Sequence, residues 1–257
     1  MLSSLFHRMF PPTAGTKAVA LSYQSLPNDG RSLYVVGDIH GSAGLLRRIE
    51  AAIMADMNGQ PAQLVLLGDL IDRGPDSAEV LDHMLRRPPA GLTRYAILGN
   101  HEAMFLRFLE NPAQAGAWLN FGGRETLASY GIDPHKFAAL PAKQQRQQID
   151  ANIPAVHRNF LADLPAILTW GDVIFVHAGF DFAAPIAAQS EDTILWARAP
   201  TARERLPRGT ILVHGHFPSD LPDLTQPVIN MDVGAYITNR GCILHLDPSG
   251  KRRLIEI

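Results

Sequence analysis

The sequence predicts an α/β fold, in which short buried strands alternate with helices. Its 257 residues are 46% hydrophobic, which supports a substantial core and excludes a disordered chain. Three apolar runs each stop at a glycine, and stretches with helical periodicity lie between them; the runs are 33–36, 64–67 and 95–98. Short continuous runs are typical of parallel strands that are covered on both faces. We therefore expect one large domain built on a buried, largely parallel sheet, with two small domains as the alternative.

The first elements along the chain are an irregular segment and two helices. Residues 1–32 are predicted to be an irregular lead-in that closes with a turn at 27–30. Apolar side chains within residues 2–10 could form a short amphipathic helix, for which packing on its own domain is favoured over membrane contact because the segment is short. Ser42 is predicted to cap a helix that reaches about Asp56. A second helix is expected from about Ser77 to Arg86.

The second half of the chain is predicted to carry a helical insertion and then further strands. Residues 101–165 have a mostly helical pattern and would cover the sheet edge, with the polar run 143–148 as a solvated helix face. Strands are expected to resume at 166–169, 173–176 and 210–213. From Val228 onward the sequence predicts strands and hairpins, with turns at 239–241 and 247–250.

Charge and cysteine content narrow the classes of partner. The formal net charge of −2 at pH 7 gives no general attraction to nucleic acid or to acidic membranes. Cys242 is the single cysteine, so no intrachain disulfide can form and a reducing compartment is the simplest fit. No apolar run in the sequence reaches the roughly 18 residues of a membrane span. We therefore expect a cytoplasmic protein with no nucleic-acid partner and no stable membrane insertion.

Five apolar strands are followed directly by side chains that can bind metal ions. These side chains are Asp38 with His40, Asp69, Asn100 with His101, His177, and His214 with His216. A single Gly-Asp pair after a strand is usually a turn, and a single histidine there is usually packing. In open α/β sheets, however, ligands bind beyond the carboxyl ends of the strands, so neighbouring strands would bring all five sets together. Five such endings in one chain favour a shared metal site.

The residue types in this set indicate which metals would bind. Carboxylates, an amide and several imidazoles suit manganese, iron or zinc better than calcium or magnesium. The absence of cysteine from the set argues against a structural zinc site. One carboxylate can bridge two metals about 3.5–4 Å apart. Two divalent cations carry about +4, and two aspartates with one hydroxide leave about +1, which would attract a phosphate dianion.

The motifs formed by these residues resemble those of a known family. Residues 37–41, 68–74 and 99–102 resemble the three signature motifs of the phosphoprotein phosphatase branch of the calcineurin-like metallophosphoesterases. Residues 177–179 and 215–218 resemble its later histidine motifs, and 119–124 and 232–236 are similar to its bacterial serine/threonine protein phosphatases. The resemblance covers residues 33–247. It implies a single domain over 1–257, with two mixed sheets sandwiched between helices in four layers and a helical cap at about 103–165.

The resemblance also implies a ligand set for two divalent metal ions. Manganese is the expected metal, with iron or zinc as alternatives. One metal would be held by Asp38 and His40, and Asp69 would bridge the pair. The implied ligands of the second metal are Asn100, His177 and His216. His214 is expected either to support the ligands from behind or to pack in its strand, because the family pattern places the ligand directly after Gly215.

The same resemblance implies the catalytic residues. His101 would protonate the leaving oxygen as general acid, and Asp72 would accept its other N–H and fix its tautomer. Arg73 would hold two phosphate oxygens in a fork. Arg198 would be a second clamp, with an ordinary surface arginine as the alternative.

Other positions carry weaker expectations. Glu102 is expected to support its loop through hydrogen bonds. Arg124 could contact substrate at the cap edge, although a structural ion pair is favoured. Ala178 and Phe217 depart from the common family pattern, but neither change removes a ligand.

The leading functional hypothesis is a phosphomonoesterase that acts on phosphoserine, phosphothreonine or phosphotyrosine in proteins. Water would attack phosphorus in line, with no phosphoenzyme. A symmetrical dinucleoside polyphosphate hydrolase acting on diadenosine tetraphosphate is the second hypothesis, and a catalytically silent phosphoprotein-binding module is the third. The partner is accordingly a phosphorylated protein or a small phosphoester. A cysteine-phosphatase mechanism is excluded because Pro248 stands where that motif needs arginine, and Cys242 is expected to be buried.

Overall fold

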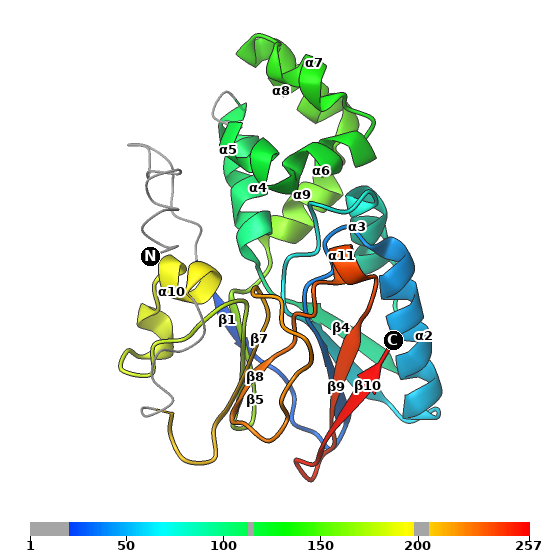
Figure 1. Cartoon of the computed structure of the whole chain (residues 1–257), viewed down its shortest axis with the longest axis vertical. Helices are drawn as coiled ribbons and strands as arrows, with labels where there is room; N and C mark the ends of the chain where they lie inside the picture. Colours follow the sequence, from blue (N-terminus) through cyan, green and yellow to red (C-terminus); the bar gives the residue numbers. More distant parts are fainter. Residues whose placement is uncertain (1–20, 113–115, 198–205) are drawn as a thin grey trace.

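A computed structural model describes residues 21–112, 116–197 and 206–257. The helix predicted within residues 2–10 and the candidate clamp Arg198 lie outside these ranges. In the described ranges, the strands form two five-stranded sheets that face each other (Figure 1).

The first sheet has the strand order β10-β9-β2-β3-β4. Its strands are β2 (Ser32–Val36), β3 (Ala62–Leu66), β4 (Leu92–Ala96), β9 (Cys242–Leu246) and β10 (Arg252–Glu256). Strands β2, β3 and β4 run parallel, whereas β9 runs antiparallel to both β2 and β10. The third strand is predicted at 95–98, but β4 spans Leu92–Ala96. β4 is an edge strand whose middle residues are only partly buried, so it lacks the continuous apolar run on which the prediction relies.

The second sheet has the order β1-β5-β6-β7-β8. Its strands are β1 (Tyr23–Ser25), β5 (Ile167–Trp170), β6 (Val173–Val176), β7 (Ile211–His214) and β8 (Val228–Asn230). Strands β6, β7 and β8 run parallel, and β5 is antiparallel to β6. Strand β1 lies within the predicted irregular lead-in. Its three residues are exposed, so it has no hydrophobic pattern, and it forms by pairing with β5.

Both sheets are mixed, which confirms the α/β class with two mixed sheets. The expectation of one largely parallel sheet is wrong.

Alternate side chains of β2 explain the layering. Leu33 and Val35 belong to the core between the sheets, together with Phe175 and Val213 of the second sheet. Tyr34 and Val36 belong to the core beneath the helices. A run of buried residues predicts a strand but does not show which sheet the strand joins.

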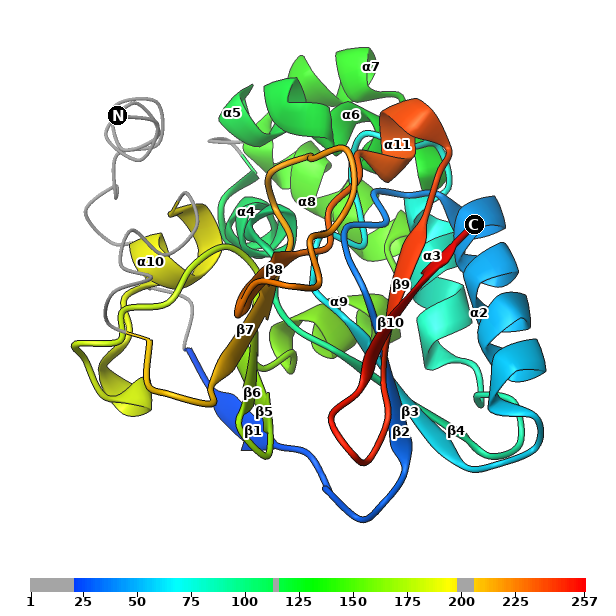
Figure 2. The same cartoon turned by 60° about the horizontal axis from the view of Figure 1, so that its bottom comes forward.

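Helices cover the outer face of each sheet, which completes four layers (Figure 2). Helices α2 (Ala43–Met57) and α3 (Ser77–Leu85) pack on the first sheet. Helix α10 (Glu191–Trp196), preceded by the 3-10 turn η3 (Ile186–Ala188), packs on the second. None of the helices in the described ranges has the length and apolar character that crossing a bilayer requires.

The start of α2 differs in one detail from the prediction. Ser42 occupies the N-cap position, but its side chain makes no hydrogen bond to the helix. Its φ and ψ of −96° and 70° lie outside the extended region typical of capping, and its hydroxyl instead donates to the His40 carbonyl at 3.4 Å. The hydroxyl therefore serves the preceding loop rather than the helix.

A group of helices between β4 and β5 stands above the ends of the sheets (Figure 1). These helices are α4 (Asn100–Glu110), α5 (Gly116–Trp118), the π-type turn η2 (Leu119–Gly123), α6 (Arg124–Ser129), α7 (Pro134–Ala138), α8 (Ala142–Asn152) and α9 (Ala155–Ala162). We refer to α4–α9 as the cap. The polar run 143–148 lies in α8 and is mostly exposed, but Gln145 is buried and donates to the Phe137 carbonyl at 3.1 Å.

The C-terminal region contains one hairpin and one short helix. The predicted turn at 247–250 joins β9 to β10, and the Asp247 carboxylate accepts hydrogen bonds from the backbone of Ser249 and Lys251. The predicted turn at 239–241 does not close a hairpin. It follows α11 (Ala235–Thr238), a helix too short to show periodicity in the sequence.

Candidate metal centre and acid site

The five predicted strand endings converge between the two sheets, below the cap. The Asp69 carboxylate lies at their centre. Its Oδ2 atom is 3.5 Å from Nε2 of His40, 3.4 Å from Nε2 of His177 and 3.9 Å from Nε2 of His101. These neighbours follow β2, β6 and β4, so three separate strands deliver donors to one carboxylate.

The remaining predicted ligands lie against the same centre. His177 Nε2 is 2.8 Å from Asn100 Oδ1 and 3.2 Å from His216 Nδ1. Asp38 Oδ2 is 3.7 Å from His40 Nε2. Two overlapping triads have ligand atoms within 4.8 Å of one another; they are His40, Asp69 and His101, and Asp69, His177 and His216. Asp69 is common to both, which is the position a bridging carboxylate needs.

Strained backbone accompanies this convergence. Five of the seven non-glycine residues with positive φ in the described ranges lie at the site: His40, Asp69, Asp72, Arg73 and His216. Such conformations persist where the surrounding structure holds them, and they concentrate at functional sites. Gly68 has a φ of +87°, and a Cβ there would lie 2.7 Å from Gly99 Cα. Glycine before the aspartate thus lets two neighbouring strand ends approach closely.

Glu102 holds this loop, as the sequence predicted. Its carboxylate accepts hydrogen bonds from the backbone N–H groups of Gly99, Asp69, Leu70 and Ile71, at 2.9, 2.8, 2.8 and 3.3 Å. It is fully buried, and burial raises the pKa of its carboxyl to about 7, while these backbone donors favour the charged form. The carboxylate ties the N-terminus of α4 to the loop that carries Asp69.

Glu102→Gln is expected to lower the free energy of unfolding by about 2–3 kcal/mol, because an amide replaces a charged acceptor that serves several donors. Urea unfolding of the purified variant measures this change. Glu125→Gln is a matched control on an exposed position of α6, and its effect should stay within about 0.5 kcal/mol. Equal effects of the two substitutions would contradict the role of Glu102.

The donor set fits divalent cations. Asp38 Oδ2 and His101 Nε2 are buried and have no hydrogen-bond partner among the described residues. The Nδ1 atoms of His40 and His177 donate to the carbonyls of Ile71 and Leu67, at 2.9 and 2.8 Å. Because these bonds hold a proton on Nδ1, both Nε2 atoms face the cluster and are the atoms that would bind metal. This second-atom bonding is typical of metal-ligating histidines.

Electrostatics also favour positive charge at the centre. Burial, together with the nearby carboxylates of Asp232 and Asp69, raises the pKa of Asp38 well above its usual range. Burial opposes charge on Asp69 as well, but His177 and His101 outweigh it and hold the pKa of Asp69 well below its usual value. Asp69 and Asp38, acting against burial, raise the pKa of His177 to about 10. Buried carboxylates at this density favour a nearby positive charge, which bound metal ions would supply.

His101 and Asp72 form a separate pair at the edge of the cluster. His101 Nδ1 donates to Asp72 Oδ2 at 2.7 Å, and both side chains are fully buried. His101 Nε2 makes no hydrogen bond within the part of the chain that the structure describes, and it lies 3.9 Å from Asp69 Oδ2. This geometry leaves Nε2 able to exchange a proton with a group bound at the centre.

Arg73 borders the same centre on the side of α11. Its Nη1 lies 2.8 Å from His40 Nε2, and its guanidinium lies 4.8 Å from the centroid of the Tyr236 ring. Its backbone N–H donates to the Gly122 carbonyl at 3.0 Å. Gly122 belongs to the segment 119–124, so the part of the cap that resembles bacterial phosphatases is the part that supports Arg73.

Gly122→Ala is expected to lower kcat/KM by about 10²-fold, because it displaces Arg73. A Cβ at Gly122, where φ is +110°, would lie 2.7 Å from Arg73 Cγ. Gly131→Ala is the matched control: φ is +75° there, and a Cβ would meet no atom within 4 Å. Both variants should lose about 1 kcal/mol of stability from backbone strain. Equal kcat/KM values for the two variants, measured on p-nitrophenyl phosphate, would contradict the expected displacement.

Two further expectations concern residues beside the site. His214 is buried in β7, its Nδ1 lies 3.0 Å from the Gly215 carbonyl, and it belongs to neither triad. It therefore packs in its strand, as expected. The prediction that Arg124 forms a structural ion pair is not met within the described residues. Its Nη2 instead lies 3.4 Å from the Asn120 side-chain oxygen.

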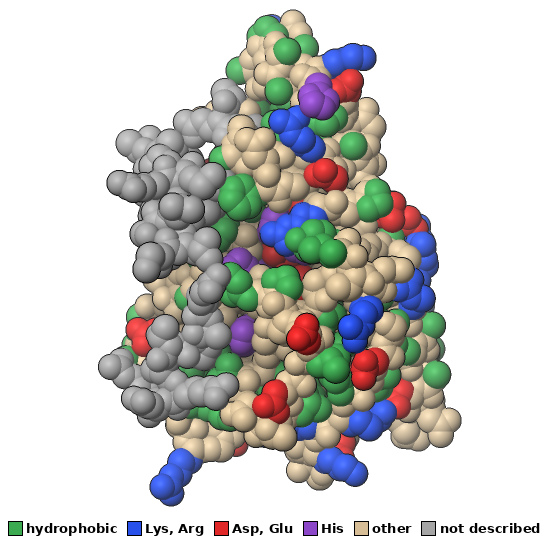
Figure 3. Space-filling view, viewed as in Figure 1, with side chains coloured by type: hydrophobic (Ala, Val, Ile, Leu, Met, Phe, Trp, Pro, Cys, Tyr) green, Lys and Arg blue, Asp and Glu red, His purple; other side chains and the backbone are tan. Residues whose placement is uncertain are grey.

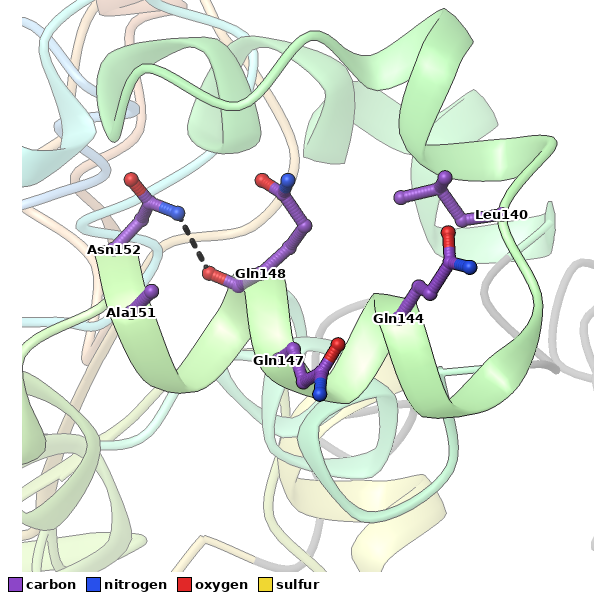
Figure 4. A pocket seen from close by; sticks show the side chains of 6 residues that line it. All are labelled: Leu140, Gln144, Gln147, Gln148, Ala151 and Asn152. Carbon is purple, nitrogen blue, oxygen red and sulfur yellow. Dashed lines mark hydrogen bonds between the residues drawn. The ribbon is translucent and has the colours of Figure 1, made fainter.

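The surface view places the site in a mixed environment. Below the cap, histidine side chains lie beside lysine or arginine and hydrophobic side chains (Figure 3). A concavity lies on the cap itself, along α8 (Figure 4). It is lined by Leu140, Gln144, Gln147, Gln148, Ala151 and Asn152. Because these side chains carry neither charge nor imidazole, this concavity lacks the chemistry of the centre below.

Comparison with known proteins defines the family. Residues 31–256 match the calcineurin-like phosphoesterase family, so the chain belongs to it. The chain is 26% identical over 234 residues to an asymmetrical bis(5'-nucleosyl)-tetraphosphatase of Bacillus velezensis, a match that covers 80% of this chain and 85% of the relative. It is 41% identical over 95 residues to serine/threonine-protein phosphatase 1 of Salmonella typhimurium, covering 36% of this chain and 39% of the relative.

A solved structure confirms the fold. A protein provisionally described as a diadenosine tetraphosphatase superposes with a TM-score of 0.64 at 22% identity, covering 92% of this chain and 98% of the other. The family and the candidate ligands together define a hydrolase of the metallophosphoesterase class that uses divalent metal ions.

Sequence reasoning assigned no role to three residues that contact the acid pair or lie near the metal-binding cluster. Trp118 and Thr126 both donate to the Asp72 carboxylate. Asp232 is buried near Asp38, and burial raises its pKa to about 6. Trp118 and Thr126 lie just outside the family-like segment 119–124, so their proximity to it was the available signal.

Proposed function

We propose that this protein hydrolyses phosphomonoesters, with phosphoserine and phosphothreonine in proteins as the substrate class. Phosphotyrosine is also a phosphomonoester, with a phenolic leaving group, and is included in the test below. The proposal rests on one observation: a buried histidine, oriented by a buried aspartate, has a free Nε2 atom beside a cluster of metal-binding side chains. The cluster would bind the phosphate through its metal ions, and the histidine would supply the proton.

The cluster would hold two divalent metal ions. We propose Asp38 and His40 for one metal, Asp69 as the bridge, and for the other metal Asn100, His177 and His216. When bound, these ions supply Lewis-acid activation of water and neutralise phosphate charge. Manganese is the proposed ion. Because it lies at the weak end of the divalent series, it would be lost on purification and restored by addition.

His101 has the role of general acid in this proposal. Its Nε2 proton passes to the leaving-group oxygen as the ester bond breaks. The proton on Nδ1 stays on the imidazole, hydrogen-bonded to Asp72. Arg73 holds two phosphate oxygens with its guanidinium, which is planar and forked. Arg198 is proposed as a second clamp on the sequence alone, since it lies outside the described residues.

Leaving-group chemistry supports the phosphomonoester. A serine or threonine alkoxide is far more basic than a phosphate oxygen, so its departure depends more on a proton donor. The His101–Asp72 pair is of most use for such a substrate. The 41% identity to serine/threonine-protein phosphatase 1 supports the same class, although it covers only 36% of the chain.

A dinucleoside tetraphosphate is the second candidate substrate. It is favoured by a relative of that named activity that matches 80% of this chain, including regions beyond the metal-binding motifs. Its cleavage would break a phosphoanhydride at the same centre. Symmetrical cleavage of diadenosine tetraphosphate yields two ADP, whereas asymmetrical cleavage yields ATP and AMP.

One substrate panel tests the proposal. The protein is freed of metal by chelation, reconstituted with manganese, iron or zinc, and assayed on phosphoserine, phosphothreonine and phosphotyrosine peptides and on diadenosine tetraphosphate. A kcat/KM at least about tenfold higher on a phosphopeptide supports the proposal. A preference for diadenosine tetraphosphate replaces it with the second candidate. Phosphopeptide binding without phosphate release, with every metal, would favour a silent binding module.

A further inference from the structure

The Asp72 carboxylate is held from two directions, and one of them is the cap. Oδ2 accepts from Trp118 Nε1 at 2.8 Å as well as from His101 Nδ1 at 2.7 Å. Oδ1 accepts from the Thr126 hydroxyl at 2.6 Å. Trp118 is 2% exposed, and Asp72 and Thr126 are fully buried. Two of the three side-chain donors to this carboxylate therefore come from α5 and α6.

The kink between α5 and α6 makes this arrangement possible. Trp118 and Thr126 are eight residues apart, which would separate them by about 12 Å along a straight helix. The turn η2 interrupts the helix, with Gly122 at a φ of 110°. A Cβ on Gly123 would collide with the Trp118 ring. The two glycines thus fold the segment so that both donors reach one carboxylate.

We propose that Trp118 and Thr126 are positioning residues for the proton transfer from His101. The terminal torsion of an aspartate is broad and roughly two-fold, so a single hydrogen bond leaves the carboxylate free to turn. Donors on both oxygens fix its plane and keep Oδ2 against His101 Nδ1. His101 Nε2 is then held toward the leaving group. This inference rests on the proposed function, because it gives the cap a part in the acid step.

The inference predicts a dependence on the leaving group. Phenolate is a basic leaving group and needs a proton, whereas dinitrophenolate leaves readily without one. Losing either cap donor should therefore slow the hydrolysis of phenyl phosphate more than that of 2,4-dinitrophenyl phosphate. A purely structural loss would slow both esters to the same extent.

The experiment uses the full-length, manganese-loaded protein and its variants Trp118→Phe and Thr126→Val. Thr126→Ser keeps the hydroxyl and should behave as the unmodified protein does. Trp170→Phe is the matched control, because the Trp170 indole is also buried and donates to a backbone carbonyl, that of Pro27, at 3.2 Å. We expect Trp118→Phe and Thr126→Val to lower kcat on phenyl phosphate about tenfold or more, and kcat on the dinitrophenyl ester less than about threefold.

Equal losses on the two esters, or equal behaviour of Trp118→Phe and Trp170→Phe, would overturn the inference. If the unmodified protein hydrolyses neither ester with any metal, the proposed function fails instead. The proton resonance of His101 Nδ1–H in the metal-free protein then decides the inference separately. The signal should move in Trp118→Phe and Thr126→Val and remain in place in Thr126→Ser. An unmoved signal in the first two variants would overturn the inference.

Discussion

Asp69→Asn is expected to abolish binding of both metal ions and to lower kcat by about 10³-fold or more. The Asp69 carboxylate is the one group common to both triads, and its Oδ2 atom lies within 3.9 Å of three imidazole nitrogens. An amide keeps the size of the side chain but removes the negative charge that attracts two cations. Elemental analysis after dialysis against manganese measures the metal, and phosphate release measures kcat.

Asp150→Asn is the control for this substitution. Asp150 lies on α8, is about half exposed and pairs with Arg158. Its replacement should leave two metal ions bound and kcat unchanged. If Asp69→Asn also retained two bound metal ions, the bridging role of Asp69 would be wrong.

His101→Asn is expected to lower kcat on a phosphoserine peptide by about 10²–10⁴-fold while metal binding is retained. His101 has its Nδ1 on Asp72 and its Nε2 unpartnered beside the centre, so its loss removes the proton donor. The loss should be smaller on p-nitrophenyl phosphate, whose leaving group needs less protonation. Steady-state kinetics on both substrates, together with elemental analysis, separate this effect from loss of metal.

The histidine control is His135→Asn, which alters an exposed imidazole on α7 and should change neither kcat nor metal content. Unchanged turnover of the phosphopeptide by His101→Asn would remove His101 as the acid. Loss of metal in that variant would instead place His101 among the ligands, since it belongs to one of the two triads.

The convergence of the site could be predicted from the sequence because strand endings are local features. Each apolar run ends in a glycine or directly in a polar side chain, and Asp38, Asp69 and His177 follow three such runs. The prediction needed only that the carboxyl ends of the strands lie together. The structure meets that condition with two sheets rather than one.

Several features could not be predicted because they depend on contacts between distant residues. Strand β1 is exposed and exists only through its pairing with β5. Asp72 lies far along the sequence from its donors Trp118 and Thr126. The kink at Gly122 brings these two donors together, and no periodic pattern in the sequence indicates it. Ser42 is a residue type that often caps helices, but its hydroxyl donates a hydrogen bond to the His40 carbonyl in the preceding loop.

The most direct test of a two-metal centre is an anomalous-difference map from crystals of the protein grown with manganese. Two peaks should appear about 3.5–4 Å apart, both within coordination distance of the Asp69 carboxylate. One should also contact Asp38 and His40, and the other should contact His177 and His216. A map with no peak at these side chains, or with peaks that Asp69 does not contact, would contradict the two-metal centre.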